Sequence, residues 1–392
     1  MAIKDVTVIG SGLIGSAATR HLAENGHSVT LIGAIQDNRD RVHASHYDEA
    51  RITRFIGPDI VWSDLAATSI SRYAAIEERS GTKFHTACGH LRCDLPDHHP
   101  ESTLPAVRAV RKQLKNDGRE LSREDIEARF PFLSFQQGAV FHWDSEPAGI
   151  INPRRLIEAQ IQLARRSGAN VVQGVCTHVL RHDNMYTVRD SSGNKYLSGN
   201  VLVCAGAYTN RFSLVPEPLN LEVRPETVVL KEISQELLKR MATMPGIIWN
   251  FDHVPGVSSV YVLPPVRYPD ERIYVKMGAD FDKDVQINTL SEMHAYMISG
   301  GSIRTKELLA PILRELVPEL AVSPTTSKPC LLTYTPTGYP MIDELEDGWY
   351  VATGGCGKSA KSSDQIGKLA ADLIRKEPWK TFKPSTFAAS VL

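Results

Sequence analysis

The sequence has few cysteines, no long apolar run and no excess of either charge. Its six cysteines form no CxxC pair, which argues against a disulfide framework and leaves reduced thiols as the expectation. No stretch approaches the ~18 consecutive apolar residues that a membrane span needs. The 44 Lys and Arg residues nearly match the 45 Asp and Glu residues, which argues against a broad nucleic-acid or anionic-membrane surface. Because the first residues also lack the pattern of a secretory signal, we expect a cytoplasmic protein.

The length and composition predict a globular protein with more than one domain. At roughly 150 residues per domain, a chain of 392 residues holds two or three. Hydrophobic residues make up 42% of the chain, which is enough for a sizeable core. The sequence shows no internal repeat and no low-complexity tract.

The start of the chain has the pattern of a dinucleotide-binding βαβ unit. A short buried strand is predicted over residues 3–9, a helix follows, and a second strand is predicted over residues 28–33. Between the first strand and the helix, three glycines have the G-x-G-x-x-G spacing. They permit a tight turn, close approach of a pyrophosphate and close helix–strand packing, while the helix N-terminus offers free N–H groups to the phosphates. The expected phosphate site is formed by Gly10, Ser11, Gly12, Leu13, Ile14 and Gly15.

One residue of this pattern is missing. An acidic side chain usually ends the second strand and bonds the ribose hydroxyls, but this sequence has Gly33 there. The absence is compatible with NADP, whose extra phosphate would suit Arg39 and Arg41. It is equally compatible with a ribose held by Asp37, or by backbone and water alone.

Five later segments complete a recognisable set. They are SHYDEARITR (45–54), AGIINPRRL (148–156), CAGAYT (204–209), PCLLTYTPTGYPMID (329–343) and GGCG (354–357), the last followed by a lysine and serines. With GSGLIG (10–15), and in this order over nearly the whole chain, they resemble the D-amino-acid-oxidase-like flavoprotein superfamily. The resemblance is to the branch of monomeric sarcosine oxidases and N-methyl-amino-acid oxidases.

The resemblance implies an α/β plus α+β architecture in which two domains interleave. The Rossmann-like FAD-binding domain would take residues 1–84, 148–215 and 325–392. A substrate-binding domain with a mixed sheet would take residues 85–147 and 216–324.

The resemblance also implies FAD as the cofactor, and a covalent thioether between the flavin and Cys330. Cys330 lies in KPCLLTYT, at the position of the cysteine that carries the flavin in sarcosine oxidases. Read from the residues alone, it is an ordinary buried thiol on a strand. The further cofactor contacts implied are Ser45, His46, Arg51, Thr177, Gly206, Gly355, Gly357 and Lys358.

Three cations match residues that act on the substrate or on oxygen in this branch. Lys276 matches the lysine that promotes the reaction with oxygen, where a fixed cation stabilises developing negative charge. Arg54 and Lys361 match the pair that binds the substrate carboxylate. Arg51 matches an arginine near the flavin ring, and we group it with Lys276 as catalytic.

The sequence departs from the branch in the expected pocket wall. Tyr47, Asp280 and Lys358 stand where sarcosine oxidases have histidines. Asp280 would pair with Lys276 or receive a basic group of the substrate. We therefore place Tyr47 and Asp280 in the substrate site and expect a substrate other than sarcosine itself to be possible.

The implied reaction is oxidation of a secondary amine or N-substituted amino acid. A hydride equivalent would pass to the flavin, leaving an imine, and oxygen would reoxidise the flavin to give hydrogen peroxide. The expected partners are this small molecule and oxygen, and the expected state is a monomer or small homo-oligomer. Two alternatives stay open, namely an NADP-dependent dehydrogenase and a flavoprotein that passes electrons to a partner.

A histidine- and cysteine-rich stretch follows the predicted helix of residues 62–81. Its spacing matches no common zinc pattern, and a strand with a polar loop is the expectation, without a metal. The residues concerned are His85, Cys88, His90, Cys93, His98 and His99.

Overall fold

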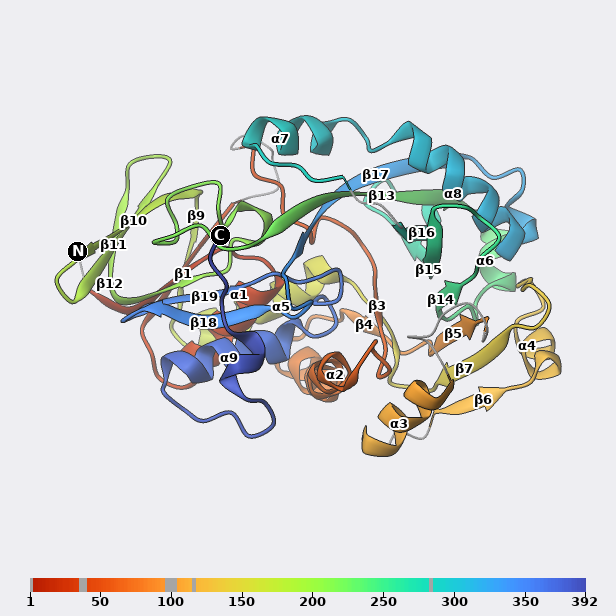
Figure 1. Cartoon of the computed structure of the whole chain (residues 1–392), viewed down its shortest axis with the longest axis horizontal. Helices are drawn as coiled ribbons and strands as arrows, with labels where there is room; N and C mark the ends of the chain where they lie inside the picture. The colour runs from red at the N-terminus through yellow and green to blue at the C-terminus, as the bar shows by residue number, and fades with distance from the viewer. Residues whose placement is uncertain (1–2, 35–40, 96–103, 115–117, 282–284) are drawn as a thin grey trace.

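Two large β-sheets form the framework of the computed structural model, which describes residues 3–34, 41–95, 104–114, 118–281 and 285–392 (Figure 1). A small third sheet lies between them and consists of β3 (Arg51–Thr53), β4 (His85–Thr86) and β8 (Gly149–Ile151). The expected α/β fold with a Rossmann-like unit is confirmed. Arg39, Asp37, His98 and His99 lie outside the described residues.

The first sheet is built around the expected βαβ unit. Its strands are β1 (Lys4–Ile9), β2 (Val29–Gly33), β9 (Asn170–Gln173), β10 (Cys176–His182), β11 (Met185–Asp190), β12 (Lys195–Val203), β18 (Met341–Glu346) and β19 (Trp349–Thr353). The order is β10-β11-β12-β1-β2-β9, and β19 pairs with both β12 and β18. Because β1 runs parallel to β2 and β12, the turns after these three strands meet at one edge of the sheet.

Four helices pack on one another beside this sheet: α1 (Leu13–Glu24), α2 (Ile60–Ser80), α5 (Pro153–Arg166) and α9 (Ser363–Ile374) (Figure 1). A buried ionic cluster joins them. Asp364 of α9 accepts hydrogen bonds from Arg20 of α1 (2.6 Å), Arg72 of α2 (2.5 Å) and Gln160 of α5 (2.9 Å). Removing Asp364 would leave Arg20 with Glu24 as its ionic partner, and removing Arg20 would leave Asp364 with Arg72, so each single loss weakens the cluster without leaving an unpaired buried charge.

The second sheet carries most of the remaining strands. They are β5 (His90–Asp94), β6 (Arg119–Leu121), β7 (Val140–Asp144), β13 (Glu222–Glu232), β14 (Gly246–Asn250), β15 (Val257–Arg267), β16 (Ile273–Phe281) and β17 (Thr325–Tyr334), in the order β17-β13-β16-β15-β14-β5-β7-β6. Its helices are α3 (Leu104–Leu114), α4 (Arg123–Arg129), α6 (Gln235–Arg240), α7 (Leu290–Ile298) and α8 (Ile303–Leu316). α8 packs across β13, β16 and β17, and its apolar side joins the largest buried cluster of the protein.

The pairing of β17 corrects one expected boundary. Residues 325–334 were expected in the FAD-binding part, but β17 is hydrogen-bonded along its whole length to β13 of the second sheet. The chain returns to the first sheet only at β18. The physical reason is the long-range ladder itself, since the sequence of an extended segment does not show which sheet receives it.

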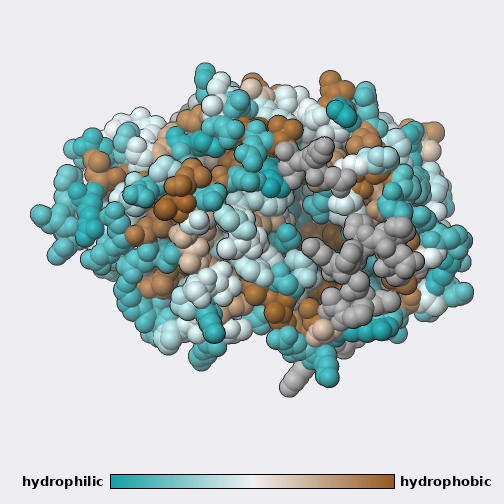
Figure 2. Space-filling view, in the orientation of Figure 1, coloured by the Kyte–Doolittle hydropathy of each residue, from teal (hydrophilic) through white to brown (hydrophobic). Residues whose placement is uncertain are grey.

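On the face seen in Figure 2, the surface has no large patch that is uniformly hydrophobic or uniformly hydrophilic. Apolar side chains lie there in small groups among hydrophilic ones. None of the helices in the described part of the chain combines the length and apolar character that crossing a bilayer requires.

Candidate active site

The glycine-rich turn after β1 has the close contacts that its sequence predicts. Gly10 has φ +104°, and a Cβ there would lie 2.3 Å from the Cys204 carbonyl oxygen. A Cβ on Gly15 would lie 1.9 Å from the carbonyl oxygen of Gly10. By contrast, nothing lies within 4 Å of a Cβ built on Gly12, which caps α1 without a side-chain hydrogen bond. The first N–H groups of α1 therefore face open space, as a phosphate site requires.

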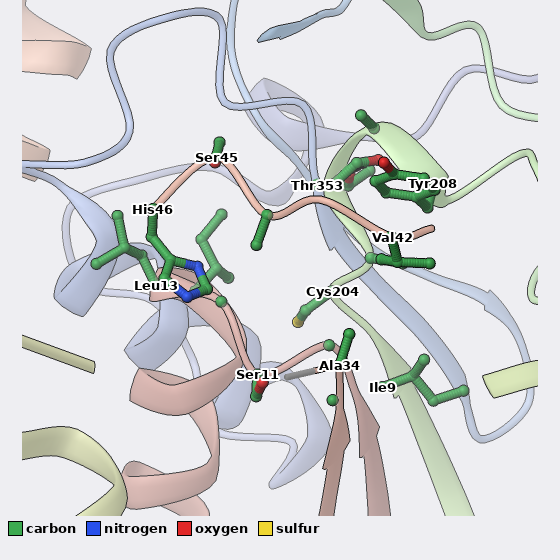
Figure 3. Close-up of a pocket in the computed structure, with 18 of the residues that line it drawn as sticks. Ile9, Ser11, Leu13, Ala34, Val42, Ser45, His46, Cys204, Tyr208 and Thr353 are labelled. Atoms are coloured by element: carbon green, nitrogen blue, oxygen red, sulfur yellow. Dashed lines mark hydrogen bonds between the residues drawn. The ribbon is translucent and has the colours of Figure 1, made fainter. Parts of the chain in front are cut away.

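A long first cavity begins at this turn. Figure 3 shows Ser11 and Ala34 at its lower side in that view, and the loop with Val42, Ser45 and His46 above them. Burial lowers the pKa of His46 to about 3, so its imidazole is neutral. The expected cofactor residues that line this cavity are Gly10, Ser11, Gly12, Leu13, Ile14, Ser45, His46, Gly206 and Gly355. Thr177 does not line it. The bulge in β10 after Cys176 turns the Thr177 hydroxyl toward the Arg189 carbonyl (3.4 Å), and Val175 and Cys176 line the cavity instead.

The structure gives a reason for the missing ribose acid. A Cβ on Gly33 would lie 2.0 Å from Ser11 Oγ and 2.6 Å from Ser11 N. The phosphate turn therefore packs directly against the end of β2, and no side chain fits at residue 33. Arg41 lines none of the cavities described here, so the described residues give the NADP interpretation no phosphate ligand.

We expect Gly33→Ala to weaken cofactor retention because the new methyl group must displace the Ser11 turn. Overpacking of this kind costs about 1–3 kcal/mol. Thermal unfolding and the bound-flavin content of purified protein would measure it. The double variant Ser11→Gly, Gly33→Ala relieves the contact and should recover part of the loss; equal loss in both variants would contradict the packing explanation.

A second cavity of about 380 Å³ continues from the first, because Ala44 and Ser45 line both. It lies between the 44–54 segment, β13, β15, β16, β17 and the turn before α9. The predicted site residues that line it are Ser45, Tyr47, Arg51, Arg54, Asp280, Cys330, Gly357, Lys358 and Lys361. Segments that lie more than 300 residues apart in the chain thus line one cavity.

Arg54 and Lys361 converge in the second cavity, as predicted. Neither has a carboxylate within ion-pair distance among the described residues; Arg54 donates to the Ile56 carbonyl and Lys361 to the Lys358 carbonyl (3.0 Å). Burial, aided by Arg92, lowers the pKa of Arg54 to about 10. Burial and the nearby Arg54 lower the pKa of Lys361 well below its usual range. Two basic side chains that lie together with no carboxylate at ion-pair distance among the described residues have the chemistry to bind an anion.

Cys330 lies on β17 at the boundary of the two cavities. Its Sγ is 4.0 Å from the carbonyl oxygen of Ser45, the residue that lines both. Burial raises the pKa of the thiol, while Arg51 acts in the opposite direction. A second buried cysteine, Cys356, lines the same cavity, and the sequence reasoning did not single it out.

Lys276 is buried on β16 and is paired with Asp48, not with Asp280. Its Nζ lies 2.5 Å from Asp48 Oδ2 and 2.6 Å from the Ala50 carbonyl oxygen. The expected alternative that Asp280 pairs with Lys276 is wrong, because Asp280 lies four residues further along β16 and accepts from Ser259 Oγ (2.9 Å). Asp48 was missed in the sequence, although it lies within the SHYDEARITR segment.

The histidine- and cysteine-rich stretch forms no metal site among the residues described. His85 lies on β4, whereas His90 and Cys93 lie on β5. No group of three potential ligands comes together in the described part of the chain.

The βαβ unit and its glycine-rich turn define the dinucleotide-binding class, and two basic side chains line a second cavity beside the first. The model of the family described as DAO, FAD dependent oxidoreductase, matches residues 5–373, and the chain belongs to this family. The family resemblance predicted from the sequence is thereby confirmed, and FAD rather than NADP is the cofactor.

Curated relatives and solved structures agree with this membership. The peroxisomal sarcosine oxidase of Mus musculus is 23% identical over 95% of this chain and 93% of its own length. The monomeric sarcosine oxidase of Streptomyces avermitilis is 25% identical over 98% of both chains. The structure of NikD, an unusual amino acid oxidase essential for nikkomycin biosynthesis, has a TM-score of 0.80 at 20% identity and covers 100% of this chain and 98% of its own.

Proposed function

We propose that this protein is an FAD-dependent oxidase of a secondary amine that carries a carboxylate, such as an N-substituted amino acid. The observation that carries the proposal is the convergence of Arg54 and Lys361, without a carboxylate partner among the described residues, in a cavity that continues into the cofactor cavity. The names of the relatives, sarcosine oxidase among them, support this substrate class.

FAD fits the first cavity. The open space beside Gly12 and the free N–H groups of α1 suit its pyrophosphate, and the continuation past Ser45 suits its ring system. When bound, FAD supplies the acceptor for a hydride equivalent and the means of passing electrons to oxygen. We propose Cys330 as its covalent attachment point, because the thiol lies at the boundary of the two cavities.

The side chains of this protein would contribute to the reaction by orienting the substrate and by placing positive charge beside the cofactor. Arg54 and Lys361 would hold the substrate carboxylate, so that the amine is directed toward the first cavity without a charged partner of its own. Lys276 and Arg51 would place positive charge near Cys330. We assign Lys276 to the oxygen side of the reaction and name oxygen as the electron acceptor.

Asp280 supports a narrower substrate proposal. It lines the second cavity, bonds only a serine hydroxyl among the described residues, and lies close enough to Arg54 to raise the pKa of that residue against the effect of burial. With Tyr47 in the same wall, it would receive a basic or hydrogen-bonding group of the substrate. A panel of N-substituted amino acids with neutral and basic side chains would test this.

We expect Arg54→Ala to raise the apparent KM at least tenfold and Lys361→Ala to raise it less. Charge-assisted hydrogen bonds contribute about 1.5–3 kcal/mol each, and Arg54 presents two donors in a fixed fork. Steady-state oxygen consumption with an amino acid and with its uncharged analogue would measure the effect.

The matched control is Arg224→Ala. Arg224 lines the same cavity but already has the Glu222 carboxylate at 2.5 Å. It should change KM less than Arg54→Ala. Carboxylate inhibitors should also bind more weakly as pH rises, because Lys361 must take up a proton to pair with them. Equal use of the acid and its uncharged analogue by the wild-type enzyme would contradict the proposed substrate class.

A further inference from the structure

Asp48, which lines the second cavity, joins its own chain segment to β16 and to the turn that precedes β16. Its Oδ1 accepts hydrogen bonds from Tyr268 Oη (2.8 Å) and from the Glu49 backbone N–H (2.8 Å). Its Oδ2 accepts from Lys276 Nζ (2.5 Å) and from Arg51 Nη1. With both oxygens engaged twice, the carboxylate has one orientation in which all four donors are satisfied.

Two acceptors fix the ammonium group of Lys276. The group has three hydrogens, and only Asp48 and the Ala50 carbonyl oxygen accept from it among the described residues. The side chain is 2% exposed, so bulk water does not supply the third acceptor freely. One N–H is therefore left without an acceptor among the described residues, and the neighbouring Arg51 and Cys330 line the second cavity.

The charge of Lys276 depends on Asp48. Burial lowers the pKa of Lys276 to about 8, Asp48 opposes this effect, and Arg51 adds to it. Burial alone would raise the pKa of Asp48, but Lys276 and Arg51 hold it well below its usual range, so the carboxylate stays ionised. The titratable groups that face Lys276 are Asp48, Arg51, Cys330 and, through Asp48, Tyr268.

Tyr268 reaches Asp48 from a third cavity, which lies behind the 49–52 segment and is also lined by Glu49, Ile150, Pro264 and Pro265. Its ring is buried and packed edge-on against Tyr274 (5.2 Å between centroids), and Lys328 Nζ lies 4.5 Å from its centroid. A turn closed by Tyr268 N–H to the Arg272 carbonyl (2.9 Å) fixes its backbone. These contacts fix the orientation of the Tyr268 hydroxyl toward Asp48.

We propose that Asp48 and Tyr268 are positioning residues that keep Lys276 protonated and oriented, with one N–H directed to the cofactor site. Asp48 supplies the counter-charge, and Tyr268 holds its other oxygen so that the carboxylate cannot turn away toward Arg51 alone. The assignment of a task to Lys276 rests on the proposed function, whereas the effect of Asp48 on Lys276 does not.

The test is a titration of Lys276 itself in the FAD-loaded enzyme. Carbon-13 at Lys Cε reports protonation by NMR, and the Lys276 signal is assigned by its loss in Lys276→Arg. Wild type should titrate near pH 8. Asp48→Asn should bind the proton at least about tenfold more weakly, moving the midpoint down by at least one pH unit. Tyr268→Phe should move it downward, by less than Asp48→Asn does, because the carboxylate is then free to turn away from Lys276 toward Arg51. Tyr274→Phe, which keeps the Tyr268 hydroxyl, should leave it unchanged.

A second measurement relates the protonation of Lys276 to the rate of turnover. The high-pH fall in the oxygen-dependent rate should move with the NMR midpoint in each variant. An unchanged midpoint in Asp48→Asn, or in Tyr268→Phe where the first variant does not fold, overturns the positioning role. If the midpoint moves but no amine-dependent oxygen consumption is found even in wild type, the proposed function fails and the positioning role stands.

Discussion

Acid precipitation of the purified enzyme should leave the yellow flavin in the protein pellet, and Cys330→Ser should release it to the supernatant. The expectation rests on the position of Cys330 at the junction of the two cavities, 4.0 Å from the Ser45 carbonyl oxygen. Arg51 and Lys276 lie near enough to favour the thiolate against burial, and the thiolate is the form that makes a carbon–sulfur bond. The change is all-or-none, because a serine cannot form the thioether.

Cys356 provides the control. It lines the same cavity, is also buried, and donates to the Gly354 carbonyl at 3.3 Å. Cys356→Ser should keep the colour in the pellet, and peptide mapping of the wild type should find the flavin on the peptide with Cys330. Flavin on the Cys356 peptide, or free flavin from the wild type, would refute the assignment.

Replacing Lys276 with methionine should slow the reaction with oxygen by ~10²–10³ and affect anaerobic reduction by the amine much less. The physical reason is the loss of a fixed positive charge where negative charge develops. The variant should fold, because Asp48 keeps Arg51, Tyr268 and the Glu49 N–H as partners and does not become an unpaired buried charge. Stopped-flow measurement of the two half-reactions separates the effects.

Lys231 is the matched control for this experiment. It is also buried on the second sheet, on neighbouring β13, but its ammonium donates to the Ser323 carbonyl (2.9 Å) away from the cavities. Lys231→Met should change stability without a selective loss of the oxygen reaction. A wild-type rate of reoxidation in Lys276→Met would remove the proposed role of Lys276.

The sequence predicted best what depends on neighbours along the chain. The turn at Gly10, Gly12 and Gly15 lies between its strand and helix as expected, because close backbone contacts leave little choice of residue. Arg54 and Lys361 were placed together only through the family resemblance, since 307 positions separate them. In the structure both line the second cavity.

The features that could not be predicted from the sequence depend on contacts between segments that are distant in the chain. Asp48 looked like one polar residue in a polar stretch, and its importance comes from Tyr268 and Lys276, which lie more than 200 positions away. The pairing of β17 with β13 was missed for the same reason. Gly33 was read as a clue to the cofactor, whereas its packing against Ser11 gives a steric reason for the missing side chain.

The ionic cluster at Asp364 affects when the protein can complete its folding during translation. Arg20 belongs to the helix that presents its N-terminus to the first cavity, yet its buried counter-ion is contributed by a residue near the other end of the chain. A ribosome synthesises the helix long before it reaches Asp364. Glu24 of the same helix can pair with Arg20 early, but Asp364 and the helix that carries it, which packs on α1, are still missing, so α1 reaches its final packing late in translation. The nascent chain therefore completes its flavin site only when almost all of it has been synthesised, and a product cut short before α9 should emerge without bound cofactor.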